Sequence, residues 1–186
     1  MNKKQLIIDE AIGLFATKGY YGVGLSELLK KCHVPKGSFY HYFPNGKIQL
    51  IQETLQSAYI YMENHIRKEF FVDDISSYVG FERMIDHLSL EVGIQKNFVS
   101  LLMTMISIES RYMDEGVNKT CAELYTKWQE LYTDYLRKYD YTEQECIEKS
   151  HIAFTMIHCS LITSWIKNDA EDLQKTKIIL KNLLEK

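Results

Sequence analysis

The stretch VPKGSFYHYFPNGK, from Val34 to Lys47, concentrates side chains that could bind a polyanion. A lysine near each end supplies positive charge, and the hydroxyl, phenol and imidazole groups between them offer hydrogen bonds. Groups of these kinds contact phosphates and base edges in complexes with DNA. A glycine among them removes a side chain where a sugar-phosphate backbone could approach closely. The candidate contact residues are Lys36, Gly37, Ser38, Tyr40, His41, Tyr42 and Lys47.

Short helices separated by sharp turns are expected to position these groups. Apolar spacing predicts a first helix that ends at Lys18–Tyr20 and a second from about Leu25 to Cys32. A turn at His33–Pro35 then precedes a third helix near Lys36–Tyr42, which Pro44 ends. A helix, a tight turn and a short helix form the arrangement that inserts the second helix into the major groove. From spacing alone, an ordinary helical hairpin with a glycine defect is the alternative.

The charge of the chain is distributed unevenly. The 186 residues have a net charge of −3, but residues 1–50 contain seven lysines and three acidic residues, a net charge of +4. Residues 51–186 have a net charge of −7. A basic head on an acidic body suits a polyanion that is bound at one end only, and chance segregation of solvated charge is the alternative.

The rest of the chain predicts an all-α protein. It is 46% hydrophobic and has only two prolines, both in the opening stretch, with no strand-type alternation. We expect about nine helices, namely a three-helix helix-turn-helix head at residues 1–46, with its motif at 24–43, and a helical bundle at 47–186. A long helix from Lys47 to about Phe70 would connect head and body, and a capping box at Thr142–Glu145 opens another helix that runs to about Ile166.

Enzymatic and metal chemistry are not expected. Glu148 and His151 have the spacing used in di-iron bundles, but a second such pair is missing, so a surface carboxylate beside a histidine is the better interpretation. His87 and Glu91 are spaced like an exposed helical pair. No nucleophile elbow, phosphate-binding glycine loop or Cys/His signature occurs. We predict no catalytic residue, no metal site and no cofactor, and the four scattered cysteines indicate reduced thiols in the cytosol.

One segment without charged residues, Ser150–Ile166, requires burial. It is shorter than the roughly 20 residues of a membrane-spanning helix, and the N-terminus does not resemble a signal peptide, so a cytoplasmic protein without a membrane segment is expected. Together with the leucine-rich last helix it is the best candidate for a homodimer interface, through helices at about 143–166 and 170–185. The sequence leaves open whether a second copy or another partner covers it.

Residues 8–50 resemble the N-terminal DNA-binding domain of TetR-type transcriptional regulators. The spacing agrees over more than forty residues, and the core KGSFYHYF is specific. The matching residues are Ala11, Leu14, Phe15, Lys18, Gly19, Tyr20, Leu28, Val34, Lys36, Gly37, Ser38, Tyr40, Tyr42, Phe43 and Lys47. The resemblance implies a homodimer, usually a repressor, that releases double-stranded operator DNA when a small molecule enters the C-terminal body.

The resemblance also implies roles for single residues. Lys36, Ser38, Tyr40 and His41 would lie on the recognition helix, Tyr42 and Lys47 would contact phosphates on either side of it, and Gly24 and Ser26 would offer backbone or hydroxyl contacts.

Four positions depart from the family pattern. Gly24 stands where Thr or Ser is common, Pro35 where Ser is usual, and His33 replaces a turn glycine, although histidine tolerates a positive φ better than most residues. The spacing in PNGK is one residue longer than usual. This spacing, with PKGS before it, is similar to the branch of lincomycin- and flavonoid-responsive regulators of the LmrA and YxaF type.

Soft aromatic and thioether side chains in the body predict an adaptable site for an aromatic or apolar effector. The candidates are Tyr59, Met62, Met105, Glu109, Tyr125 and Trp128. Core packing is the alternative for each of the apolar side chains. Glu109 follows a long run without charge, so it could be a counter-charge for a cationic ligand or a salt bridge at a helix end or interface.

The sequence therefore predicts a ligand-responsive, dimeric repressor. A helical module that binds a partner protein without binding DNA is one alternative. An activator or a corepressor-dependent regulator of the same fold is the other.

Overall fold

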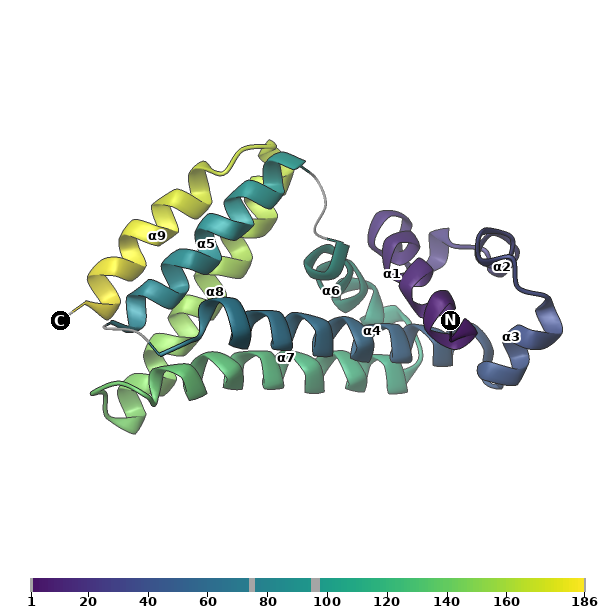
Figure 1. Ribbon diagram of the computed structural model, residues 1–186, viewed down its shortest axis with the longest axis horizontal. Helices are drawn as coiled ribbons and strands as arrows, with labels where there is room; N and C mark the ends of the chain where they lie inside the picture. Colours follow the sequence, from purple (N-terminus) through teal and green to yellow (C-terminus); the bar gives the residue numbers. More distant parts are fainter. Residues whose placement is uncertain (1, 74–75, 95–97, 186) are drawn as a thin grey trace. The chain divides into compact units, whose positions relative to one another are not determined.

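The computed structural model describes residues 2–73, 76–94 and 98–185, and the regular structure in these ranges is helical (Figure 1). The helices are α1 (Lys3–Gly22), α2 (Leu25–Cys32), α3 (Lys36–Tyr42), α4 (Gly46–His65), α5 (Ser77–Ile94), α6 (Phe98–Glu109), α7 (Glu115–Leu136), α8 (Glu143–Lys167) and α9 (Glu171–Leu184). A π-helical turn (η1, Ile66–Phe70) follows α4, and a 3-10 turn (η2, Ser110–Tyr112) follows α6. The prediction of an all-α protein with about nine helices is confirmed for the described residues.

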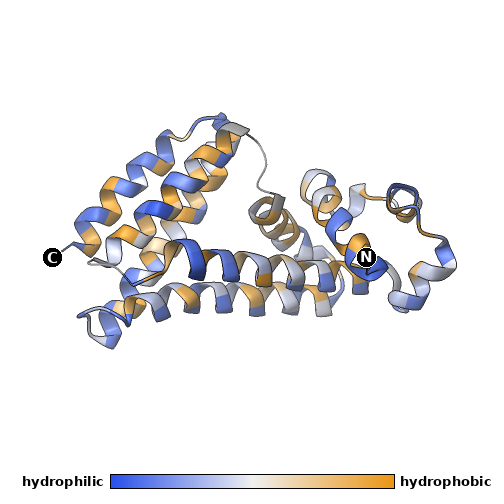
Figure 2. Cartoon of the chain, viewed as in Figure 1, coloured by the Kyte–Doolittle hydropathy of each residue, from blue (hydrophilic) through white to orange (hydrophobic). Residues whose placement is uncertain are grey.

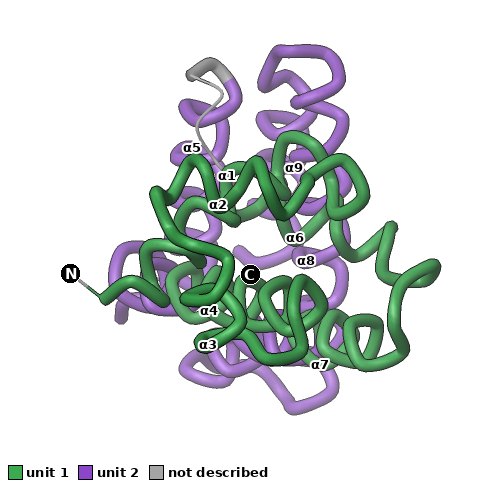
Figure 3. The backbone as a smooth tube through the Cα atoms, turned by 90° about the vertical axis from the view of Figure 1, so that its right-hand side faces the viewer, with its two compact units in different colours: residues 1–62, 98–125 green, residues 63–97, 126–186 purple. Residues whose placement is uncertain are grey.

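The contacts divide the chain into two compact units (Figure 3). Unit 1 consists of Met1–Met62 and Phe98–Tyr125, and unit 2 consists of Glu63–Asn97 and Thr126–Lys186. The boundary falls within helices α4 and α7. Unit 1 therefore contains most of α4, all of α6 and the first half of α7 in addition to the predicted head. Packing thus groups the chain differently from the proposed functional division at residue 46.

Aromatic side chains form the core of the helix-turn-helix region. Phe39 and Phe43 are completely buried, and their ring centroids lie 5.2 Å apart. The turn between α2 and α3 depends on His33, whose φ of 52° is left-handed and lets its amide donate to carbonyls at the end of α2. The tolerance for positive φ that the sequence predicts at His33 is thus used in the fold.

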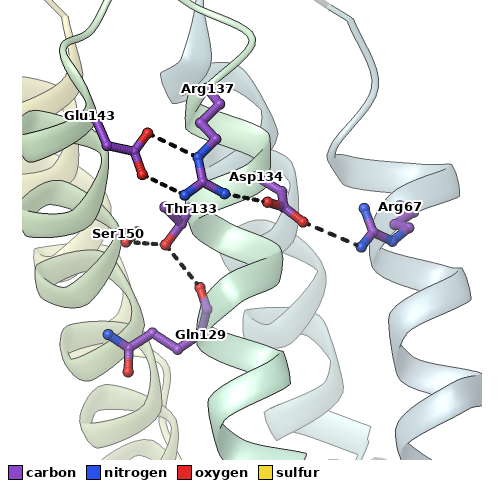
Figure 4. A network of polar contacts seen from close by, with 7 residues as sticks. All are labelled: Arg67, Gln129, Thr133, Asp134, Arg137, Glu143 and Ser150. Carbon is purple, nitrogen blue, oxygen red and sulfur yellow. Dashed lines mark hydrogen bonds and ion pairs between the residues drawn. The ribbon is translucent and has the colours of Figure 1, made fainter.

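In unit 2, the start of α8 is fixed to α7 by paired polar groups (Figure 4). The Arg137 guanidinium donates to both carboxylate oxygens of Glu143, at 3.0 and 2.5 Å, and to Asp134 at 2.7 Å. Below them the hydroxyls of Thr133 and Ser150 share a hydrogen bond of 2.7 Å in a buried position. The predicted capping box is also present, since Thr142 and Glu145 cap each other's backbone amides at this end of α8.

Stacked aromatic rings hold α5 against α7 in unit 2. The rings of Phe71 and Tyr135 stack with centroids 4.2 Å apart, and Phe81 packs against Tyr135 at 5.6 Å. Gly80 makes this close approach possible, because a Cβ at this position would lie 2.5 Å from the Tyr135 hydroxyl and 2.7 Å from the Phe70 carbonyl oxygen. The helix can approach this closely only where it has no side chain.

Most of the helices have one apolar and one polar face (Figure 2). Such helices pack their apolar stripe into a core and expose the other. Among the described residues, no helix combines the length and the apolar character that a membrane crossing needs.

Candidate nucleic-acid interface

Helix α3 has one face that is buried in the core and one face that is exposed to solvent. Phe39 lies in the core with no exposed surface, whereas the adjacent Tyr40 is 43% exposed. Lys36, Gly37 and His41 are exposed as well. The Lys36 ammonium lies 6.0 Å from the centroid of the Tyr40 ring, so a cation and an aromatic hydrogen-bonding group occupy neighbouring places on the solvent side of the helix.

Neither glycine of the predicted interface is required by the fold. Gly24 precedes α2 with an ordinary φ of −78°, and a Cβ at Gly24 or Gly37 would meet no atom within 4 Å. Gly37 lies within α3, where glycine costs helix stability without a compensating contact, whereas Gly24 is a tolerated N-cap residue. Open space in front of both residues is what a site for a closely approaching backbone would need.

The remaining predicted DNA contacts have different surroundings. Ser26 is exposed near the start of α2, while Ser38 and Tyr42 are half-buried. Lys47 points inward, because its ammonium donates to the carbonyl oxygen of Tyr20 and lies 4.0 Å from the centroid of the Tyr20 ring. Burial lowers the pKa of the Lys47 ammonium, and the nearby Glu109 carboxylate acts in the opposite direction.

The predicted effector residues are distributed over both units. Tyr59 and Met62 are buried on α4, and Met105 is half-buried on α6. Tyr125 lies among the Thr104 and Ser107 hydroxyls of α6, which hydrogen-bond to its phenol. Burial is the larger influence and raises the pKa of the Tyr125 phenol, while these hydrogen bonds lower it.

Trp128 and Glu109 have well-defined partners of their own. Trp128 belongs to unit 2, where its ring lies 4.1 Å from His158 and 5.7 Å from Phe154, centroid to centroid. Glu109 belongs to unit 1, where its carboxylate accepts the backbone amide of Tyr20 at 2.6 Å.

Two residues with distinctive surroundings, Tyr20 and His158, were missed by the sequence analysis. The residues Lys18–Tyr20 predict the end of a helix. They do not show that the Glu109 carboxylate, 89 positions further along the chain, accepts the Tyr20 amide. His158 gives no signal in the sequence, yet burial lowers its pKa to about 4.

A surface hollow of about 470 Å³ lies elsewhere in unit 1 and is lined by none of the predicted effector residues. Its lining residues are Ser110, Arg111, Met113, Glu115 and Asn118.

The pairs that could have suggested metal chemistry have ordinary partners. Glu148 accepts from Gln144 at 2.6 Å, and His151 shares a hydrogen bond of 3.2 Å with Gln129. His87 lies 3.2 Å from Glu91 as an i,i+4 pair, as its spacing predicts. In the described parts of the chain, no group of three or more His, Cys, Asp or Glu residues could hold a metal ion.

Two family profiles match the chain, one in its N-terminal region and one in its C-terminal region. Residues 7–54 match the family profile described as bacterial regulatory proteins, tetR family, and residues 78–177 match the C-terminal domain of LmrA/YxaF-like transcriptional regulators. The HTH-type transcriptional regulator LmrA of Bacillus subtilis is 26% identical over 187 residues, which cover 100% of this chain and 98% of that protein.

Solved structures agree in fold. The reduced form of NemR from Escherichia coli superimposes with a TM-score of 0.83 at 20% identity, covering 99% of this chain and 97% of that one. FadR of Bacillus subtilis, in complex with stearoyl-CoA, superimposes with a TM-score of 0.71 at 17% identity, covering 97% of both chains. With a helix-turn-helix profile at its N-terminus and a regulator-specific profile over the C-terminal half, the chain belongs to the TetR family of bacterial transcriptional regulators, in its LmrA/YxaF-like group.

Proposed function

We propose that the protein is a ligand-responsive repressor that binds a palindromic operator as a homodimer in the bacterial cytoplasm. The observation that carries this proposal is the solvent face of α3, where Lys36, Tyr40 and His41 are exposed beside a completely buried Phe39. A helix anchored by its apolar side and presenting donors on the other suits insertion into the major groove.

The proposed DNA contacts fall into two classes, those that bind phosphates and position the protein, and those that read the base edges. Lys36, Tyr42 and Ser26 would hold phosphates, and the open backbone at Gly24 and Gly37 would let the duplex approach. Ser38, Tyr40 and His41 would reach base edges. Lys47 would have to leave Tyr20 to reach a phosphate, so we assign it to the structure of the head instead.

A second copy of the chain is proposed to cover the outer faces of α8 and α9. These faces expose large apolar side chains that a monomer would leave in water, and the dimer would join them in a four-helix bundle. The isoleucines concerned, with their exposed fractions, are Ile147 (46%), Ile152 (39%), Ile162 (36%), Ile166 (79%), Ile178 (65%) and Ile179 (49%). Two heads would then contact half-sites about 34–36 Å apart.

The effector is proposed to be an aromatic or apolar small molecule that binds the helical body. FadR, a protein with this fold, is solved with stearoyl-CoA, and an apolar ligand in the body would likewise suit the soft side chains of this chain. Tyr59, Met62, Met105 and Tyr125, which all belong to unit 1, are the proposed contacts. For useful induction, the effector must favour the released state by about 1–3 kcal/mol.

The test is binding to the DNA upstream of the protein's own gene, measured by fluorescence anisotropy against a shuffled duplex of equal length. We expect tighter binding to the upstream DNA, and Tyr40→Ala should reduce this preference with only a small change in the thermal unfolding midpoint. Failure of the wild-type protein to bind any duplex at low ionic strength would reject the proposal and favour a module that binds a partner protein. An affinity that rises with effector would instead identify a corepressor-dependent regulator.

A further inference from the structure

Helix α1 is broken one turn before its end. Gly19 has φ 68° and ψ 173°, a left-handed conformation that is not helical, and the chain resumes helical geometry at Tyr20. A break of this kind releases the following amide from the helical ladder and leaves it in need of an acceptor. The released amide belongs to Tyr20, four residues before Gly24, the N-cap of α2.

A side chain from α6 supplies that acceptor. The Glu109 carboxylate accepts the Tyr20 amide at 2.6 Å, and α6 lies along α1 within unit 1 (Figure 1). Bonds of an amide to an ionised carboxylate are stronger than neutral ones. Glu109 thus acts as an external cap for the last turn of α1.

The same residue is held through its carbonyl by α4. The Tyr20 carbonyl accepts from the Lys47 ammonium, which also lies over the Tyr20 ring. Tyr20, in the last turn of α1, and Lys47, in the first turn of α4, lie on either side of the α2–α3 segment. Both ends of the DNA-reading segment are therefore joined at one residue, Tyr20, whose amide Glu109 accepts and whose carbonyl Lys47 contacts.

Two further features limit movement at this junction. A Cβ at Gly19 would overlap the Glu109 carboxylate, with its carboxyl carbon only 3.0 Å away, so the α1 backbone fits closely against this side chain. The Tyr21 hydroxyl donates to the Tyr112 carbonyl at 2.6 Å, which adds a second link between the end of α1 and the turn after α6. A shift at the end of α6 would be transmitted to both Tyr20 and Tyr21.

We propose that Glu109 is a positioning residue that sets the geometry of the helix-turn-helix segment from α6, by holding the backbone amide of Tyr20, the residue whose carbonyl accepts from Lys47. On this view the position of α6 reaches the DNA-reading helices through a side-chain contact with the end of α1. This inference rests on the proposed DNA-binding function for its biological meaning. The mechanical coupling itself can be measured without DNA.

The first measurement is amide hydrogen exchange in the full-length protein, residue by residue. In Glu109→Ala the amides of Tyr20–Val23 and of α2 and α3 should exchange about tenfold faster than in wild type, because the anchoring hydrogen bond is lost. Glu109→Gln keeps an oxygen that accepts the same amide and should restore slow exchange. Glu123→Ala removes an exposed carboxylate of α7 in the same unit and is the matched control.

A second variant keeps the test decisive if Glu109→Ala does not fold. Glu109→Asp keeps the charge but is one methylene too short to reach the Tyr20 amide, so it should exchange fast where Glu109→Gln exchanges slowly. Equal rates for the two variants, or α2–α3 exchange in Glu109→Ala within twofold of wild type, would overturn the inference.

A DNA-binding measurement on the same variants distinguishes failure of this inference from failure of the proposed function. On the upstream duplex, Glu109→Ala should bind about tenfold more weakly with an unchanged salt dependence, because the phosphate contacts remain the same in number. Glu109→Gln should bind like wild type. If wild type does not bind the duplex, the proposed function fails, while the exchange experiment still decides whether Glu109 positions the head.

Discussion

Helices α3 and α8 each bury one face, but their exposed faces have opposite chemistry. The outer side of α3 carries Lys36, Tyr40 and His41, whereas the outer side of α8 carries isoleucines, up to 79% exposed at Ile166. Hydrogen-bonding groups in water cost a monomer nothing, while exposed isoleucines do. From the face that the fold leaves unused we infer the partner proposed for each helix, a polyanion for α3 and a second copy of the chain for α8.

The sharpest form of this comparison uses two adjacent residues of α3. Phe39→Ala should destabilise the protein by about 3–5 kcal/mol because it leaves a cavity in a completely buried place. Tyr40→Ala should cost less, about 1 kcal/mol or below, because 43% of Tyr40 is exposed and its main contact is the edge of the Phe39 ring. Urea unfolding measures both. Similar losses of stability in the two variants would show that α3 has no face that the fold leaves free.

Helix α8 also contains a group that the fold keeps neutral. His158 is half-buried as a residue, but its ring packs on Trp128 and Phe154 and its Nδ1 lies 2.7 Å from the Phe154 carbonyl oxygen. Burial lowers the pKa of His158 from 6.5 to about 4. Its contribution to stability is therefore complete above pH 6.5 and is lost as the pH falls toward 4, because the unfolded chain takes up the proton first.

The loss of stability between pH 6.5 and 4 should be at most about 3 kcal/mol. Unfolding experiments along this pH range, on wild type and on His158→Leu, measure it. The variant should show a clearly shallower decline in the free energy of unfolding. An identical decline in both proteins would contradict the assigned cause.

The isoleucine face of α8 can be tested by adding a charge. Ile166→Lys should weaken self-association at least about tenfold, because a buried ammonium at the interface would lack a partner. Leu90→Lys changes a 72% exposed residue of α5 in the same way and is the control. Sedimentation velocity across a concentration series reports the dimer constant. If Leu90→Lys alone breaks the dimer, the second copy binds α5 rather than α8.

Gly37→Ala should separate fold from function on α3. Since a Cβ there meets nothing within 4 Å, alanine should stabilise the helix by about 0.5–1 kcal/mol. The same methyl group would stand in the path of the DNA backbone, so affinity for the upstream duplex should fall. A variant that is more stable and binds DNA as well as wild type would remove the functional reason for the glycine.

The sequence predicts this fold well where local rules act. The bounds of α3 and the capping box of Thr142 and Glu145 follow from turn residues and spacing, and both are found as expected. The contact between Glu109 and Tyr20 could not be predicted, because it depends on the tertiary approach of α6 to the break at Gly19. The effector residues cannot be identified from the sequence either. Aromatic and thioether side chains show the same spacing whether they pack in a core or line a ligand site.

The salt dependence of DNA binding by Lys36→Ala tests the proposal that the solvent face of α3 contacts DNA phosphates. Affinity for the upstream duplex should be measured from 50 to 200 mM salt for wild type, Lys36→Ala and Lys127→Ala, a control on an exposed position of α7. We predict that Lys36→Ala lowers the slope of log affinity against log salt by about 0.9, the value for one lost phosphate contact, and that Lys127→Ala leaves it unchanged. A slope for Lys36→Ala equal to that of wild type would contradict the account.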